Sequence, residues 1–298
     1  MRFGLLGTGF WAAETQAAAL AGHSGAEFAG VWGRNPARAS ELATRYGVRA
    51  YDDVDALLAD VDAVAVALPP DVQAELAARA AEAGRHLLLD KPVSLTTAAA
   101  DRIVRAVDKH GLASVVFFTN RFYDSIESFV RQSAATGGWA GARATMFASI
   151  FRPGSPYADS PWRREHGGLW DIGPHALSVL LPVLGPVAAV EATDGPYGTA
   201  HVLLRHTGGA VSTLALTLDA PPAMAATEIV FYGEPGLATM PAYDRNPVEA
   251  FRQALDELLA TAADGRTGHR CDVRFGRDVV AVLEAADTAR QAGRTAPA

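Results

Sequence analysis

Short apolar runs alternate with longer alanine-rich stretches over the first part of the chain. Apolar runs of about four to eight residues bounded by turn residues are typical of strands buried on both faces of a parallel sheet. The stretches between them carry helix signals, such as Pro36 at a helix start and Gly84 or Gly111 at a helix end. The predicted strands span 2–7, 27–32, 48–51, 63–68, 86–89 and 113–118, and the predicted helices span 11–21, 36–46, 71–83 and 96–110.

The pattern changes after about Asn120. A loop rich in Gly, Pro and Trp over 152–168 precedes an apolar helix that is predicted from Trp170 to about Leu184. Alternation of apolar and polar residues is typical of half-buried antiparallel strands. On this basis the remaining predicted strands span 144–151, 187–192, 200–206, 211–218 and 227–232, and the remaining predicted helices span 125–134, 247–263 and 277–292.

These patterns predict an α/β protein of two domains, which a length of 298 residues allows. Residues 1–119 are expected to form a doubly wound parallel sheet, because strands and helices alternate there. Residues 120–298 are expected to form an α+β domain with an open, largely antiparallel sheet. No low-complexity linker lies near Asn120, so we interpret the boundary as a change of architecture rather than a flexible hinge.

Composition and charge argue against several classes of protein. The 26 Lys and Arg against 33 Asp and Glu give a net charge of −7, which argues against a protein that binds the phosphate backbone of nucleic acids. Cys271 is the single cysteine, which excludes an internal disulfide and a cysteine-based zinc site, and we expect no metal. Pro182 and Gly185 interrupt the longest apolar run before it could span a bilayer. We therefore expect a cytoplasmic protein with no nucleic-acid or membrane partner.

A glycine loop, Gly7-Thr8-Gly9-Phe10-Trp11-Ala12, lies between the first predicted strand and the first predicted helix. In this context Gly7 permits a tight turn, Gly9 lets a pyrophosphate approach the backbone, and the small Ala12 lets the helix pack on the strand. The N–H groups at the helix start would hold the anion. A glycine turn without a ligand is the alternative, but the β-α-β units that follow favour a dinucleotide site at residues 7–11.

The end of the second predicted strand indicates which dinucleotide is bound. NAD sites usually carry Asp or Glu there to bind the ribose 2′-OH, whereas this chain has Gly33-Arg34-Asn35. The Arg34 guanidinium could pair with a 2′-phosphate. We therefore predict a preference for NADP(H), with NAD(H) possible. In the alternative interpretation Arg34 is a solvated turn residue and both cofactors are accepted.

Two further segments carry candidate catalytic groups. Lys91 follows Asp90 where an apolar parallel strand ends, at the sheet edge where ligands collect, and its partial removal from water would ease proton transfer. Downstream, Gly167-Gly168 precedes Asp171 and His175, which would share one face of a helix because they are four residues apart. A carboxylate beside an imidazole can fix its orientation. The alternative for Lys91 is a plain turn that ends a strand. The alternative for Asp171 and His175 is a pair of side chains on the surface of a helix.

In this order and spacing, the motifs make the chain resemble the Gfo/Idh/MocA family of NAD(P)-dependent oxidoreductases over nearly its whole length. The other segments that carry the resemblance are Leu68-Pro69-Pro70, Asn120-Arg121-Phe122 and Trp162-Arg163. The family's Glu-Lys-Pro motif is present as Asp90-Lys91-Pro92. Gln73 stands where many members carry His, and we expect this departure to affect the start of a helix rather than the chemistry.

The resemblance implies a Rossmann domain followed by a substrate-binding domain, with the substrate between them. The implied catalytic residues are Lys91, Asp171 and His175. The implied cofactor contacts, besides the glycine loop, are Gly33, Arg34, Asn35, Leu68, Pro69, Asp90 and Lys91. The implied substrate contacts are Lys91, Asn120, Arg121, Trp162, Arg163, Asp171 and His175. Which of Lys91 and His175 is the principal acid or base stays open, and a packing role is equally compatible with Trp162.

The function implied is hydride transfer between NADP(H) and a sugar, an inositol or a related polyol or ketone. One alternative is an NAD-assisted glycoside hydrolase of the same family. Another is a non-catalytic dinucleotide or sugar sensor, which the presence of both Lys91 and His175 makes the weakest of the three. The resemblance also implies a homodimer or homotetramer that associates through the sheet of the second domain.

Overall fold

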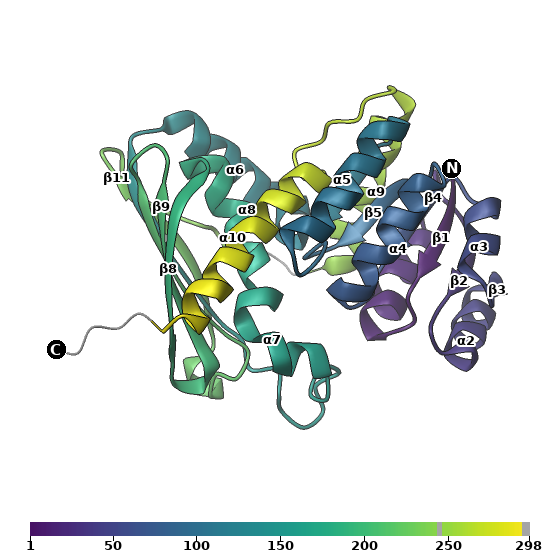
Figure 1. Cartoon of the computed structure of the whole chain (residues 1–298), viewed down its shortest axis with the longest axis horizontal. Coiled ribbons are helices and arrows are strands. Elements are labelled where there is room, and N and C mark those ends of the chain that lie inside the picture. Colours follow the sequence, from purple (N-terminus) through teal and green to yellow (C-terminus); the bar gives the residue numbers. More distant parts are fainter. Residues whose placement is uncertain (243–245, 294–298) are drawn as a thin grey trace. The chain divides into compact units, whose positions relative to one another are not determined.

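A computed structural model describes residues 1–242 and 246–293 of the chain. Contacts group the chain into two compact units, which are Met1–Phe122 with Arg245–Val280, and Tyr123–Asp244 with Ala281–Ala298 (Figure 1). The chain therefore returns to its first unit after building most of the second. The functional division into residues 1–119 and 120–298 stays a prediction.

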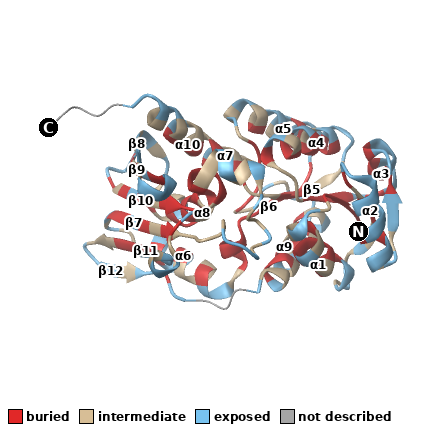
Figure 2. Cartoon of the chain, turned by 90° about the horizontal axis from the view of Figure 1, so that it is seen from below, coloured by how far each residue is buried: buried red, intermediate tan, exposed pale blue. Residues whose placement is uncertain are grey.

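The first unit is built on a six-stranded parallel sheet with the order β3-β2-β1-β4-β5-β6. Helices lie on both faces, so a central strand such as β4 is buried at every position, and the ribbon of this sheet is largely red in Figure 2. The strand order reverses between β1 and β4, which is where ligands bind in open α/β sheets. The strands are β1 (Arg2–Leu6), β2 (Glu27–Trp32), β3 (Arg49–Tyr51), β4 (Ala63–Val66), β5 (His86–Asp90) and β6 (Ser114–Phe117).

Local signals set the ends of several helices in this unit. The Asn35 and Thr96 side chains cap the helices that follow them, and Gly47 and Gly111 end those helices in the left-handed conformation. The helices are η1, a π-helix (Ala12–Ala17), α1 (Ala18–Ala21), α2 (Pro36–Tyr46), α3 (Val54–Asp60), α4 (Pro70–Glu82), α5 (Thr97–His110), the 3-10 turn η2 (Thr119–Phe122), α9 (Pro247–Ala263) and the first part of α10 (Val273–Gln291). None of the described helices combines the length and apolar character needed to cross a bilayer.

The second unit contains a six-stranded sheet with the order β12-β11-β7-β10-β9-β8. The β7–β10 pair is parallel and the others are antiparallel, so the predicted fold class is confirmed. The strands are β7 (Trp139–Phe147), β8 (Val187–Gly195), β9 (Thr199–His206), β10 (Val211–Thr217), β11 (Ala226–Gly233) and β12 (Gly236–Thr239). The helices are α6 (Asp124–Thr136), α7 (Pro161–Asp171), α8 (Gly173–Leu184) and the short η3 (Pro196–Gly198) and η4 (Pro222–Met224).

One face of this sheet is covered and the other carries charged side chains. Along β9, Val202 and Leu204 are buried, whereas His201 and Arg205 are exposed. Arg205 pairs with Glu191 on the neighbouring strand β8. Association of two copies through this sheet stays a prediction.

Several predicted elements in the second unit had wrong bounds. The strand expected at 144–151 is β7, which runs from Trp139 to Phe147. Its first part was missed because it contains Gly141, which weakens a strand pattern, and in the structure a Cβ there would meet the Val211 carbonyl oxygen at 1.9 Å. The end of the predicted 152–168 loop is helical, since α7 begins at Pro161.

Candidate functional site

The glycine loop after β1 requires glycine at its first position. Gly7 has a φ of 138°, which side chains rarely adopt, and a Cβ there would lie 2.4 Å from the Ala67 carbonyl oxygen. The Gly7 N–H donates to the Trp32 carbonyl at 2.9 Å, and the Ala67 N–H donates to Leu6 at 2.9 Å. The loop is thus held against the ends of both neighbouring strands, β2 and β4.

The second glycine of the loop faces open space. No atom lies within 4 Å of a Cβ built on Gly9, which is exposed. The Ala13 N–H bonds the Gly9 carbonyl at 2.9 Å, so Gly9 stands at the start of the helix. These residues fit the pyrophosphate of a dinucleotide, because Gly9 leaves open space at a helix start, where backbone N–H groups favour an anion.

The turn after β2 lies against the same loop. A Cβ on Gly33 would lie 2.5 Å from a Thr8 side-chain carbon, so these two predicted cofactor residues are neighbours. The Asn35 side chain accepts the Arg38 N–H at 3.2 Å and caps α2. Within residues 1–242 and 246–293, the side chains of Arg34 and Arg38 are exposed and make no hydrogen bond or ion pair. Sequence reasoning missed Arg38, which stands one turn into α2.

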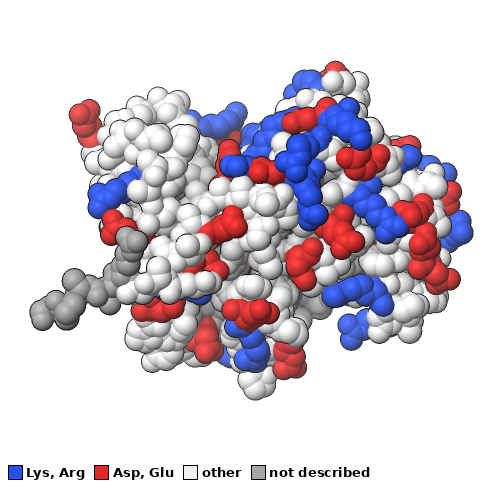
Figure 3. Space-filling model, viewed as in Figure 1, with Lys and Arg blue, Asp and Glu red and all other residues white. Residues whose placement is uncertain are grey.

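Charge on the surface of the first unit is mixed. On the face seen in Figure 3, Lys and Arg side chains stand among Asp and Glu side chains. Pairs such as Lys109 with Glu82 and Arg277 with Asp101 illustrate this. A multiply charged anion would therefore have to be held by local groups, such as helix amides and unpaired guanidinium groups, rather than by a basic face.

Lys91 lies at the carboxyl edge of the parallel sheet, directly after β5, and is half-buried. The Lys91–Pro92 peptide bond is cis. Leu68 and Pro69 follow β4 at the same edge, where Pro69 stands before α4. The Gln73 side chain is fully buried and bonds the backbone on both sides of Lys91, so its contacts reach beyond the helix start where its effect was expected, and the expectation about the chemistry stays a prediction.

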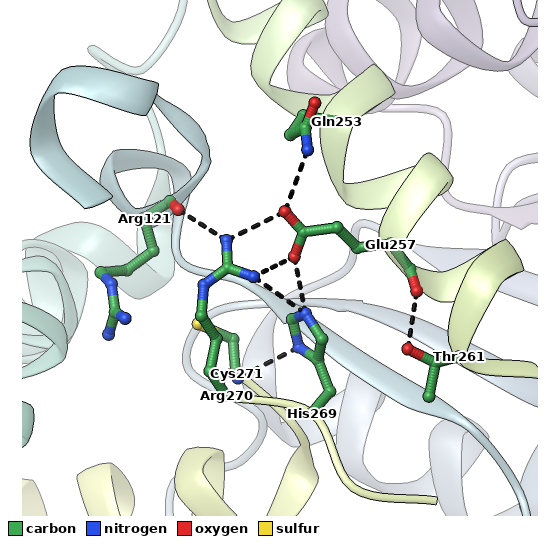
Figure 4. Close-up of polar contacts among 7 residues, drawn as sticks. All are labelled: Arg121, Gln253, Glu257, Thr261, His269, Arg270 and Cys271. Carbon is green, nitrogen blue, oxygen red and sulfur yellow. Dashed lines mark hydrogen bonds and ion pairs between the residues drawn. The ribbon is translucent and has the colours of Figure 1, made fainter. Parts of the chain in front are cut away.

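Asn120 and Arg121 form part of η2 at the end of β6 and are both buried. The Arg270 guanidinium donates to the Arg121 carbonyl oxygen at 2.9 Å. Figure 4 shows the Arg121 side chain running away from Arg270, so the contact holds the backbone of η2 and leaves the Arg121 side chain directed elsewhere. The predicted substrate contacts of Asn120 and Arg121 stay predictions.

Arg270 also belongs to a charged cluster with Glu257 and His269 (Figure 4). Arg270 binds both carboxylate oxygens of Glu257 on α9, and His269 contacts the same carboxylate at 2.6 Å. Burial raises the pKa of Glu257, but the hydrogen bonds from His269 and Arg270 and the Arg270 charge outweigh that effect and lower the pKa to about 2. The cluster escaped sequence reasoning because no local pattern links Glu257 to Arg121.

We expect Glu257→Gln to lower the free energy of unfolding at pH 7 by about 2 kcal/mol, allowing for partial solvent screening. The folded-state pKa is depressed, so this stability is present above the ordinary value of 4.5 and is lost as pH falls toward about 2. The difference in unfolding free energy between wild type and variant, measured by urea unfolding, should therefore shrink as the pH falls from about 5 to about 3.5. Glu249→Gln, at an exposed pair on the same helix, is the control and should have little effect. A difference independent of pH would contradict the assignment.

The two remaining catalytic candidates stand at a helix break in the second unit. Asp171 is the last residue of α7 and His175 is the third residue of α8. The predicted single helix was wrong because Pro174 has no N–H and would clash with the carbonyl four residues earlier. Asp171 is buried and His175 is half-buried.

The paired glycines before Asp171 have separate roles. Gly167 has a φ of 64°, which kinks α7. A Cβ on Gly168 would lie 2.8 Å from the backbone of Leu216 and Thr217, so α7 packs directly against the backbone of β10. This close approach fixes the helix segment that ends at Asp171 against the end of β10.

Arg163 holds the Asp171 carboxylate, with its Nε at 3.0 Å from the carboxylate oxygen. The guanidinium also stacks against the Tyr157 ring at 4.4 Å and the Trp162 ring at 4.7 Å. Both members of the ion pair are largely buried, so it is screened less than a surface pair. Arg163 is therefore a partner of Asp171, and its contact with substrate, like that of Trp162, stays a prediction.

The candidate residues fall into two groups by unit. The glycine loop, Lys91, Asn120 and Arg121 belong to the first unit, whereas Trp162, Arg163, Asp171 and His175 belong to the second. The described residues contain no cluster of three or more His, Cys, Asp or Glu side chains arranged to hold a metal ion.

Comparison with known proteins matches both parts of the chain. Residues 1–118 match the oxidoreductase family with an NAD-binding Rossmann fold, and residues 132–239 match the GFO/IDH/MocA C-terminal domain. The chain is 29% identical over 233 residues to dTDP-3,4-didehydro-2,6-dideoxy-alpha-D-glucose 3-reductase of Streptomyces antibioticus, covering 74% of this chain and 70% of that protein. It is 35% identical over 224 residues to inositol 2-dehydrogenase of Rhizobium meliloti (strain 1021), covering 70% and 66%.

Among solved structures, UDP-N-acetylglucosamine 3-dehydrogenase of Acidithiobacillus ferrooxidans is similar over 98% of both chains, with a TM-score of 0.82 and 24% identity. At that identity the likeness shows the fold.

Proposed function

Because the chain belongs to the Gfo/Idh/MocA family of oxidoreductases, we propose that it moves hydride between NADP(H) and a sugar, an inositol or a related polyol or ketone. The observation that carries this proposal is the glycine loop, in which Gly9 leaves open space before the amides of a helix start. The relatives named as a deoxysugar reductase and an inositol dehydrogenase support the substrate class.

The chain's own residues position the reactants and manage a proton, while the bound nicotinamide supplies the hydride chemistry. In this proposal Lys91 donates a hydrogen bond to the substrate oxygen and His175 exchanges a proton with that oxygen. Asp171, whose carboxylate Arg163 holds, orients His175 or Lys91. The amides before Ala13 bind the pyrophosphate.

The proposed preference for NADP(H) rests on Arg34 and Arg38, two exposed guanidinium groups beside the end of β2. Replacing both with alanine should lower kcat/KM for NADPH by about 10–100-fold, the worth of one or two hydrogen bonds to a charged group, and leave kcat/KM for NADH nearly unchanged. Arg45→Ala on the same helix is the control, because Arg45 is paired with Glu14. A wild-type enzyme that prefers NADH would contradict the assignment.

The function itself is tested by assaying a panel of sugars, inositols and their keto forms through nicotinamide absorbance with both cofactors. Net oxidation or reduction of a panel member supports the proposal. Tight retention of NAD through purification without net cofactor turnover would favour the glycoside hydrolase instead. Dinucleotide binding without turnover or hydrolysis of any compound would favour a sensor.

A further inference from the structure

A single side chain holds the turn that carries Lys91. Gln73 is fully buried in the first turns of α4. Its amide nitrogen donates to the carbonyl of Asp90 at 2.7 Å and to the carbonyl of Pro92 at 3.0 Å. Its amide oxygen accepts the Asp90 N–H at 3.1 Å. Both N–H donors of the glutamine are therefore used on the residues that flank Lys91.

The Asp90 side chain also holds the backbone of the turn that carries Lys91. Its carboxylate accepts the Lys91 N–H at 2.8 Å. Pro92 has no N–H to satisfy, so every backbone donor from Asp90 to Pro92 is bonded either to Gln73 or to Asp90. A buried amide that lost these bonds would be costly, which fixes Gln73 in one orientation.

The sheet topology explains why a residue of α4 reaches this turn. Strands β4 and β5 are adjacent and parallel, so both end at the same edge. Helix α4 starts four residues after β4, and the Gln73 N–H bonds the Pro69 carbonyl at 2.9 Å in its first turn. From there the side chain extends to the end of β5.

We propose that Gln73 is a positioning residue, which places the Lys91 backbone so that the ammonium group meets the reacting oxygen of the substrate. The inference rests on the proposed function, in which Lys91 contacts that oxygen. Gln73 touches the backbone around Lys91 and acts only through it. A displacement of about 1 Å at a reacting group lowers rates by roughly 100-fold, so a loosened turn would affect turnover more than binding.

The test replaces Gln73 with methionine, which has a similar length and no hydrogen-bonding amide. With NADPH or NADP⁺ and the best sugar of the panel, kcat should fall about 10–100-fold. The KM of the sugar and the dissociation constant of NADPH should change less than about threefold, because the contacts that bind substrate and cofactor before the reaction are kept. Gln73→His should recover most of the lost kcat, since an imidazole N–H can donate to one of the two carbonyls.

Gln16→Met is the matched control. Gln16 is also a fully buried glutamine of this unit, and its amide donates to the Val66 carbonyl at 3.4 Å rather than to the backbone of residues 90–92. It should keep the wild-type kcat, and it should lower the melting temperature less than Gln73→Met does, because it loses one long hydrogen bond rather than three. In hydrogen exchange, the Asp90 amide should lose protection in Gln73→Met and keep it in Gln16→Met.

The outcomes separate the inference from the function on which it rests. Wild-type kcat in Gln73→Met, or an equal fall of kcat in Gln16→Met, would overturn the positioning role while the oxidoreductase function stands. A Gln73→His variant no better than Gln73→Met would overturn it as well. A wild-type enzyme that converts no panel member would overturn the proposed function, and the inference with it.

Discussion

Lys91→Met should lower kcat by about 10²–10³-fold, the range that removal of one hydrogen-bond donor to the reacting oxygen produces. Methionine keeps the length of the side chain and removes its charge and its hydrogen-bond donors. The backbone bonds of Asp90 and Pro92 to Gln73 do not involve the lysine side chain, so the turn should keep its conformation. The measurement is steady-state turnover of the best panel substrate, together with NADPH binding by fluorescence, which should stay within about threefold of wild type.

His175→Ala, measured beside Lys91→Met, tests which group is the principal acid or base. Replacing the group that exchanges the proton should remove one limb of the pH profile of kcat. Replacing a group that only donates a hydrogen bond should lower kcat at every pH. Lys109→Met is the control for loss of a lysine, because Lys109 is exposed and paired with Glu82. Wild-type turnover in Lys91→Met would remove this residue from the catalytic set.

Alanine at the first glycine of the loop should destabilise the apo protein, whereas alanine at the second should not. Gly7→Ala should destabilise the fold by about 1–3 kcal/mol, because φ is 138° and a Cβ would meet the Ala67 carbonyl at 2.4 Å. Gly9→Ala should leave the melting temperature unchanged, because nothing lies within 4 Å of its Cβ. The new methyl group should nevertheless occupy the space of the pyrophosphate and weaken NADPH binding by about 10–100-fold.

Thermal unfolding without ligand and fluorescence titration with NADPH measure the two effects separately. Gly208→Ala, at an open position in the second unit, should change neither quantity. Wild-type NADPH affinity in Gly9→Ala would refute the assignment of this loop to the dinucleotide. An unchanged melting temperature in Gly7→Ala would show that the turn can relax.

The first sheet was predictable because burial on both faces leaves an uninterrupted apolar run. β4 and β6 are buried at every position, and their runs were recognised in the sequence. β12 and α3 were missed because four and seven residues are too few to display a period. The break between α7 and α8 was missed although Pro174 signals it, because apolar residues continue across it.

The positions of the glycine loop and of the turn at Lys91 could be predicted from the sequence, but the contacts that hold the two segments could not. Gln73 bonds a carbonyl 17 residues away, and Arg270 bonds one 149 residues away. Such contacts depend on which strands and helices become neighbours, and hydrophobic periodicity carries no information about them. The residues that act on a ligand are therefore easier to find in a sequence than the residues that hold them in place.

The late return of the chain to its first unit has a consequence for synthesis and for dissection of the protein. Phe251 of α9 packs edge-on against Phe117 of β6 at 4.9 Å, and the Val116 N–H bonds the Cys271 carbonyl at 2.6 Å. During synthesis on the ribosome, the first unit therefore lacks part of its hydrophobic core until the residues of α9 and Cys271 have been made. An excised fragment ending at residue 119 would expose that apolar surface and the edge of β6, and we expect it to aggregate.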